Sequence, residues 1–179
     1  MMATVKQKKM ERMPTKRDVY QLIINGERVE SASGETFVVT NPATGEAVAR
    51  VAKGVREDAE RAVQAARRAF DHGKWRHFPV QKRARILYQI AAIMRERFNE
   101  LVELEILNTG KALSAAQGQV MQAIEDFEFF AGAIIGHRGA VNPMPGAFHN
   151  YTEKDPVGVC AQIIPWNYPL MMAAWKVAP

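Results

Sequence analysis

An asparagine stands between two apolar segments near the end of the chain, in the stretch IIPWNYPL at residues 163–170. A side-chain amide offers two N–H donors and carries no charge. Donors of this kind stabilise the negative charge that develops on a carbonyl oxygen during acyl transfer. Asparagine is also among the most favourable helix N-cap residues, and spacing alone favours that role. Asn167 is therefore a candidate for either an oxyanion donor or a helix cap.

The segments on either side of Asn167 predict where it lies. Residues 157–164 form a near-continuous apolar run, typical of a strand buried on both faces of a parallel sheet. Pro165 ends that strand because it cannot donate to a ladder, and Pro169 suits the first turn of a helix. Ligands of open α/β sheets bind beyond the carboxyl ends of strands. Asn167 would stand at such a place.

The other nucleophilic and metal-ligating residue types give weaker signals. Cys160 is the one cysteine of the chain, which excludes an internal disulfide and predicts a reducing compartment. Its place inside the predicted strand favours a buried, unreactive thiol over a nucleophile. The four histidines show no metal-ligand spacing, so we expect no metal site.

The preceding residues must position this junction, and their patterns predict hairpins followed by helices. Residues 20–52 alternate short apolar runs with turn residues, and Asn25-Gly26 is a preferred two-residue hairpin turn. Apolar residues then recur at helical spacing. We expect three helices, over residues 57–71, over one continuous stretch from Pro79 to an end near Gly110, and over residues 113–135.

Length, composition and charge limit the classes of protein to which the chain can belong. The 179 residues are 47% hydrophobic and 24% charged, which is typical of one globular domain or two small ones. The sequence shows no run long enough for a membrane helix and no apolar signal at its start, so we expect a cytoplasmic protein with no membrane partner. Six basic side chains oppose two acidic ones in residues 1–19, which predicts a disordered basic tail and no nucleic-acid partner.

Four stretches together resemble the NAD(P)-dependent aldehyde dehydrogenase family. They are LIINGERVESASGETFVVTNPATGEAVARV, DHGKWRHFPVQKRARILYQIA, LNTGK and VGVCAQIIPWNYPLMMAAWKVAP. The resemblance runs from about Leu22 to Pro179, and its most specific signal is PWN followed by WK. It implies an α/β fold class: the N-terminal part of an aldehyde-dehydrogenase-type fold, with β-hairpins, long helices, the first strand and helix of a Rossmann-like cofactor domain, and an incomplete sheet.

The resemblance also implies roles for particular residues. Asn167 would donate its amide to the oxyanion of a thiohemiacetal. Lys176 would stand near the active site, in proton transfer; the alternative is an ordinary solvated or salt-bridged lysine of the helix. The cofactor-binding residues would be those at the strand end, which face the nicotinamide ribose: Ile163, Ile164, Pro165 and Trp166. The reaction implied is oxidation of an aldehyde to a carboxylate, with NAD or NADP as the cofactor.

The resemblance divides the chain into four parts. After the tail at 1–19 come the hairpins and helices of the cofactor-binding region at 20–140, part of an oligomerisation hairpin at 141–156, and the first strand-turn-helix of the cofactor domain at 157–179. The family's nucleophilic cysteine, general-base glutamate and phosphate loop have no counterpart here. We therefore expect a truncated sequence that is inactive alone and forms a dimer or tetramer at full length. The alternative is a non-catalytic interaction module that pairs with a full-length relative.

Overall fold

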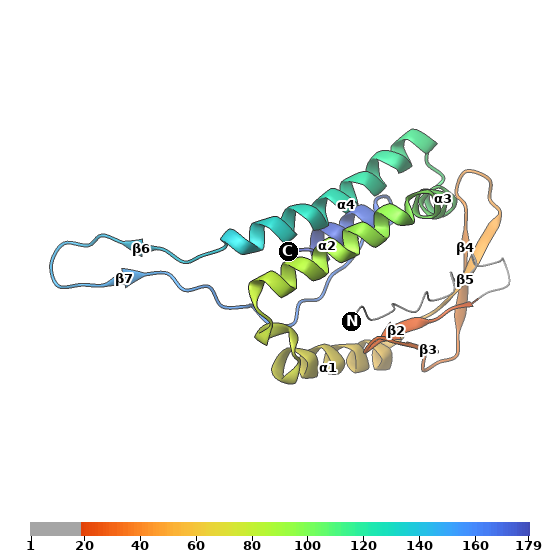
Figure 1. Cartoon of the computed structure of the whole chain (residues 1–179). Helices are drawn as coiled ribbons and strands as arrows, with labels where there is room; N and C mark the ends of the chain where they lie inside the picture. The colour runs from red at the N-terminus through yellow and green to blue at the C-terminus, as the bar shows by residue number, and fades with distance from the viewer. Residues whose placement is uncertain (1–18) are drawn as a thin grey trace, which may run out of the picture.

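The computed structural model describes residues 19–179, and the predicted basic tail lies outside the described residues except for Val19. Short strands gather on one side of the molecule, helices occupy its middle, and a long two-stranded arm projects from the opposite side (Figure 1). Within residues 19–179, no helix combines the length and the apolar character needed to cross a membrane.

Within residues 19–179, the strands form three small separate sheets. β1 (Val19–Tyr20), β5 (Ala47–Ala52) and β4 (Thr36–Thr40) are hydrogen-bonded in the order β1-β5-β4. β2 (Leu22–Ile24) and β3 (Glu27–Val29) form an antiparallel hairpin. Its turn is Asn25-Gly26, with φ of 56° and 79°, so the predicted two-residue turn is confirmed.

A buried carboxylate fixes the first helix, α1 (Arg56–His72), to the strands. The Asp58 side chain is 3% exposed and accepts hydrogen bonds from the Val55 amide (3.0 Å), the Ala32 amide (3.1 Å) and the Ser31 hydroxyl (3.0 Å). These donors lower the pKa of Asp58, with the Val55 amide contributing most and burial opposing it. One side chain thus satisfies the α1 N-terminus and the loop after β3 together.

The remaining helices are α2 (Val80–Glu96), α3 (Phe98–Thr109), α4 (Leu113–Gly136) and α5 (Pro169–Val177), with a short 3₁₀ turn η1 (Trp75–His77) before α2. The predicted helices at 57–71 and 113–135 are confirmed. The continuous helix predicted from Pro79 to Gly110 is wrong, because Arg97 (φ −98°, ψ 19°) separates α2 from α3. Figure 1 shows α3 turning away from the axis of α2. The apolar stripe continues across this one-residue break, so spacing alone does not reveal it.

The core lies around α4, which packs on α2, α3 and α5. Its fully buried residues recur at helical spacing, so that one face of the helix points inward. They are Ala116, Val120, Ala123, Ile124 and Ala131, all 0% exposed. Small alanines on this face let neighbouring helices approach closely.

Gly110 makes the turn from α3 into α4. Its φ is +68°, and its amide donates to the Ile106 carbonyl at 2.8 Å, which caps α3. A Cβ at this position would lie 2.9 Å from the Ala43 nitrogen. The turn therefore requires glycine both for its backbone conformation and for its contact with the β4–β5 connection.

The segment between α4 and α5 has little regular structure, unlike the helical core. β6 (Val141–Asn142) and β7 (Asn150–Tyr151) pair at the projecting arm, and the chain then returns without regular structure to α5. The strand predicted at 157–164 is wrong for the described residues, because no neighbouring strand pairs with it. The predicted burial of Cys160 fails for the same reason, and its thiol is exposed.

Candidate functional site

Asn167 lies in the turn between the extended segment and α5. The helix begins at Pro169, and its N-cap is Tyr168, which makes no side-chain capping hydrogen bond. Asn167 is exposed, and its side-chain amide makes no hydrogen bond to any residue from 19 to 179. The structure thus does not support the capping alternative. It leaves both N–H donors of the amide available to a ligand.

The ammonium group of Lys111 contacts the Asn167 turn and has three hydrogen-bond acceptors. Lys111 Nζ lies 3.0 Å from the Asn167 carbonyl oxygen and 2.9 Å from Glu105 Oε1, and it also donates to Gln119 Oε1. The Lys111 side chain is 14% exposed and that of Glu105 is 4% exposed. Lys111 Nζ also stands 5.1 Å from the centroid of the Tyr168 ring. A buried ion pair therefore connects α3 and α4 to the backbone of Asn167.

Sequence reasoning missed this cluster. Lys111 directly follows the glycine that ends α3, and Glu105 lies on the last two turns of the same helix. The available signal was a glutamate and a lysine on opposite sides of a helix-ending glycine, which the turn brings within reach of each other. The contact with Asn167 spans 56 positions of sequence, so local pattern gives no sign of it.

The four predicted cofactor-binding residues form the approach to the turn. Ile163 and Trp166 are 90% and 85% exposed, while Ile164 is 37% exposed and Pro165 is half-buried. Large apolar side chains with so little cover form an apolar surface beside Asn167.

Lys176 lies at the far end of α5 from Asn167. α5 begins at Pro169, and the helix from Pro169 to Lys176 alone spans roughly 10 Å along its axis. The Lys176 carbonyl accepts a hydrogen bond from Gln162 Nε2 at 2.5 Å, so the end of α5 is attached to the extended segment. The structure therefore does not bring Lys176 and Asn167 together, and the predicted role of Lys176 in proton transfer stays a prediction.

The buried side of α5 packs against α4. Ala174 and Ala178 are 2% and 5% exposed and belong to the core cluster. Burial raises the pKa of the Asp126 carboxyl on α4, where its Oδ2 atom has no hydrogen-bond partner among residues 19–179. The Asn167 turn therefore leads directly into a helix that packs on the core.

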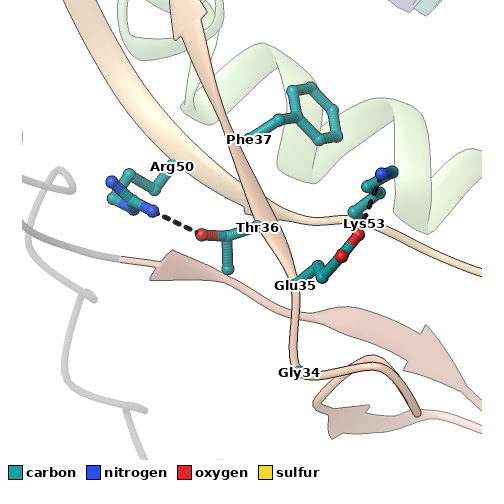
Figure 2. Close-up of a pocket in the computed structure, with 6 residues that line it drawn as sticks. All are labelled: Gly34, Glu35, Thr36, Phe37, Arg50 and Lys53. Atoms are coloured by element: carbon teal, nitrogen blue, oxygen red, sulfur yellow. Dashed lines mark hydrogen bonds and ion pairs between the residues drawn. The ribbon is translucent and has the colours of Figure 1, made fainter.

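A surface hollow of about 770 Å³ lies elsewhere, against β4 and β5. Figure 2 shows its charged groups turned toward partners within the hollow: Arg50 donates to the Thr36 hydroxyl at 2.7 Å, and Lys53 pairs with Glu35 at 2.8 Å. That pairing lowers the pKa of Glu35 through the hydrogen bond from Lys53 and its charge. None of the predicted site residues lines the hollow. Among residues 19–179, no three His, Cys, Asp or Glu side chains are grouped to hold a metal ion.

Comparisons with known proteins agree with the fold. A sequence model described as the aldehyde dehydrogenase family matches residues 29–179. The mitochondrial aldehyde dehydrogenase family 2 member B4 of Arabidopsis thaliana is 42% identical over 160 residues, which is 89% of this chain and 30% of that protein. The mitochondrial benzaldehyde dehydrogenase of Antirrhinum majus is 41% identical over the same coverage.

Solved structures give the same result. The NAD⁺ complex of an aldehyde dehydrogenase from Bacillus cereus superposes with a TM-score of 0.87 at 36% identity, covering 94% of this chain and 35% of the other. Betaine aldehyde dehydrogenase from Staphylococcus aureus, in complex with NAD⁺, gives 0.84 at 39% identity, covering 89% of this chain and 32% of that one.

The site therefore stands on part of a fold of mixed α and β structure that the solved aldehyde dehydrogenases share. The chain belongs to the aldehyde dehydrogenase family. It spans about a third of the length of the relatives that it matches. The predicted family and the predicted fold class, an α/β fold with incomplete sheets, are confirmed.

Proposed function

We propose that the protein containing these residues oxidises an aldehyde to a carboxylate with NAD or NADP. One observation carries the proposal: the Asn167 side-chain amide, just before α5, is exposed and makes no hydrogen bond within residues 19–179. Membership of the aldehyde dehydrogenase family supports it. The exposed amide can take a ligand oxygen without first losing an internal hydrogen bond.

Asn167 acts in this proposal as the donor to the substrate oxygen. Attack on the aldehyde carbonyl places negative charge on that oxygen, and a fixed N–H donor stabilises the charge in the transition state. An amide suits this role because its two N–H groups donate hydrogen bonds without ionising. Loss of one such donor typically costs about 2.7–4 kcal/mol of transition-state stabilisation.

The residues before Asn167 fit a nicotinamide cofactor. Ile163 and Trp166 present exposed apolar side chains beside the turn, and this surface suits a flat ring and its ribose. When bound, NAD or NADP accepts the hydride released from the aldehyde carbon. Ile163 and Trp166 would hold the ring near the substrate and keep water from it, while Ile164 and Pro165 set the course of the backbone.

The nucleophile and the base lie outside residues 1–179 in this proposal. Cys160 lies in the extended segment before the turn, where its Sγ atom is 3.8 Å from the Gly158 carbonyl oxygen. Within the described residues, no general base contacts the Cys160 thiol, and an adjacent base is what usually activates a nucleophilic thiol. We therefore expect the 179-residue chain alone to produce no NADH from aldehydes.

The test is an assay on the protein as it occurs in its source cells. Its intact mass is measured first, and NADH or NADPH formation is then followed with a panel of aliphatic and aromatic aldehydes. We expect aldehyde-dependent reduction of a nicotinamide cofactor by a protein considerably heavier than 20.0 kDa, and none by the 179-residue chain. A heavier protein that reduces neither cofactor with any aldehyde would contradict the proposal, and turnover by the short chain would contradict the assignment of its missing groups.

A second candidate function is assembly with a full-length relative. The β6–β7 arm projects from the helices and exposes Val141 (78%), Phe148 (75%) and Tyr151 (67%) (Figure 1). Apolar side chains on an exposed arm favour contact with another chain. Size-exclusion chromatography of the chain with a full-length relative tests this function. Co-elution is the expected result, and separate elution would contradict it.

A further inference from the structure

The geometry of Lys111 points to a role in the site that goes beyond the residues considered so far. An ammonium group has three N–H donors. Here the three acceptors are Glu105 Oε1, Gln119 Oε1 and the Asn167 carbonyl oxygen. These acceptors come from α3, from α4 and from the turn before α5, so one side chain joins three parts of the fold.

We propose that Lys111 is a positioning residue that fixes the Asn167 turn and thereby the direction of the Asn167 amide. This inference rests on the proposed function for its catalytic consequence, but not for its structural part. Glu105 and Gln119 hold the ammonium group from the helix side, and the third N–H reaches the Asn167 carbonyl at 3.0 Å.

The turn has few other restraints. Within the described residues, the amides of Trp166, Asn167 and Tyr168 donate no backbone hydrogen bond. Trp166 is 85% exposed, so packing does not hold that side either. A bond to the Asn167 carbonyl fixes the peptide plane between Asn167 and Tyr168, which limits the rotation of the Asn167 backbone. Lys111 therefore supplies an interior anchor to a turn that is otherwise exposed.

The competing interpretation is that Lys111 only connects α3 to α4 through Glu105 and Gln119. The two roles separate in a set of variants. Glu105→Gln removes the ion pair but keeps the ammonium group and an acceptor oxygen. The double variant Glu105→Gln, Lys111→Met removes the ammonium group. Lys111→Met alone would leave the buried Glu105 carboxylate unpaired and could prevent folding, whereas the double variant does not. Lys154→Met, at an exposed lysine, is the matched control.

The structural test measures ¹⁵N relaxation order parameters on the 179-residue chain. We expect the amides of residues 166–168 to have values of about 0.85 in the wild type, in Glu105→Gln and in Lys154→Met, and below about 0.6 in the double variant. The amide of Ile124 in α4 should stay near 0.85 throughout. An ordered turn in the double variant would overturn the proposal. So would disorder of the turn in Glu105→Gln, or disorder that spreads through α4.

The kinetic test uses the protein at its native length. Adding Lys111→Met to Glu105→Gln should lower kcat by about 10- to 100-fold with little change in KM, because a small misplacement of a catalytic donor has effects of that size. In an Asn167→Ala background the same addition should leave kcat unchanged. Equal losses in both backgrounds would overturn the proposal. If Asn167→Ala alone leaves kcat unaltered, the proposed function of Asn167 fails, while the order parameters still decide the structural role of Lys111.

Discussion

The helices around α4 and the extended segment before α5 are both rich in apolar residues, yet their environments are opposite. Ile124 and Val120 on α4 are 0% exposed, whereas Val157 and Ile163 are 95% and 90% exposed. A helix satisfies its backbone groups internally and needs a partner for one face alone. A strand needs a neighbouring strand for its backbone as well. The difference shows that apolar content predicts burial only where the chain also supplies the partner.

The largest expected effect comes from truncating the same residue type in the two regions. Ile124→Ala should lower the free energy of unfolding by about 2–5 kcal/mol, because it removes fully buried methyl groups and leaves a cavity. Ile163→Ala should change it by less than about 0.5 kcal/mol, because that side chain already contacts water. Urea denaturation of both variants measures the difference. Equal losses would contradict the opposite environments of Ile124 and Ile163.

The turn into α4 gives the next largest effect. Gly110→Ala should cost about 1–3 kcal/mol, since it strains a residue with φ of +68° and places a Cβ 2.9 Å from the Ala43 nitrogen. Gly118→Ala, in the interior of α4 with nothing within 4 Å of the new Cβ, is the matched control. It should stabilise the chain by about 0.5–1 kcal/mol. Thermal unfolding of the two variants should therefore shift in opposite directions, and a loss in both would contradict this account of Gly110.

A smaller, pH-dependent effect is expected at Asp58. Its pKa is lowered in the folded chain, chiefly by the Val55 amide. The carboxylate therefore contributes stability above its ordinary pKa of 3.8, and this contribution is lost as the pH falls through the lower folded pKa. Asp58→Asn should lower Tm by a few degrees at neutral pH. The gap to wild type should close in acid below the ordinary pKa. A gap that stays constant with pH would show that the charge contributes nothing.

The smallest effect should come from the exposed ion pair between α2 and α4. Arg95 and Glu128 lie 2.8 Å apart, but their side chains are 48% and 38% exposed. A double-mutant cycle with alanine at both positions should give a coupling of about 0.2–1 kcal/mol that declines with added salt. A coupling as large as the loss at Ile124 would mean that charge, and not apolar packing, holds these helices together.

Much of the helical region could be predicted from the sequence because its determinants are local. The Asn25-Gly26 turn, the ends of α4 and Pro169 in the first turn of α5 each follow from residues close by. The break at Arg97 could not be predicted, since the apolar stripe continues across it. The strand expected at 157–164 failed because pairing depends on neighbouring strands, and residues 19–179 place none there.

The candidate site shows the same division. The resemblance to the aldehyde dehydrogenase family singled out Asn167 from the local motif PWN, and the structure shows that its amide is exposed. Lys111 could not be found in this way, because its contact with the Asn167 carbonyl joins residues from distant parts of the chain. Long-range polar contacts of this kind depend on how α3, α4 and α5 pack, which no short stretch specifies.

The most direct measurement is kcat for aldehyde oxidation by the native-length protein and by its Asn167→Ala variant. We expect kcat of Asn167→Ala to fall by about 100- to 1000-fold, the effect of losing one oxyanion donor. Asn167→Asp, which keeps the size of the side chain but replaces the N–H donors with a charge, should fall at least as far. Full activity in Asn167→Ala would show that the exposed amide before α5 is not the donor to the reacting oxygen.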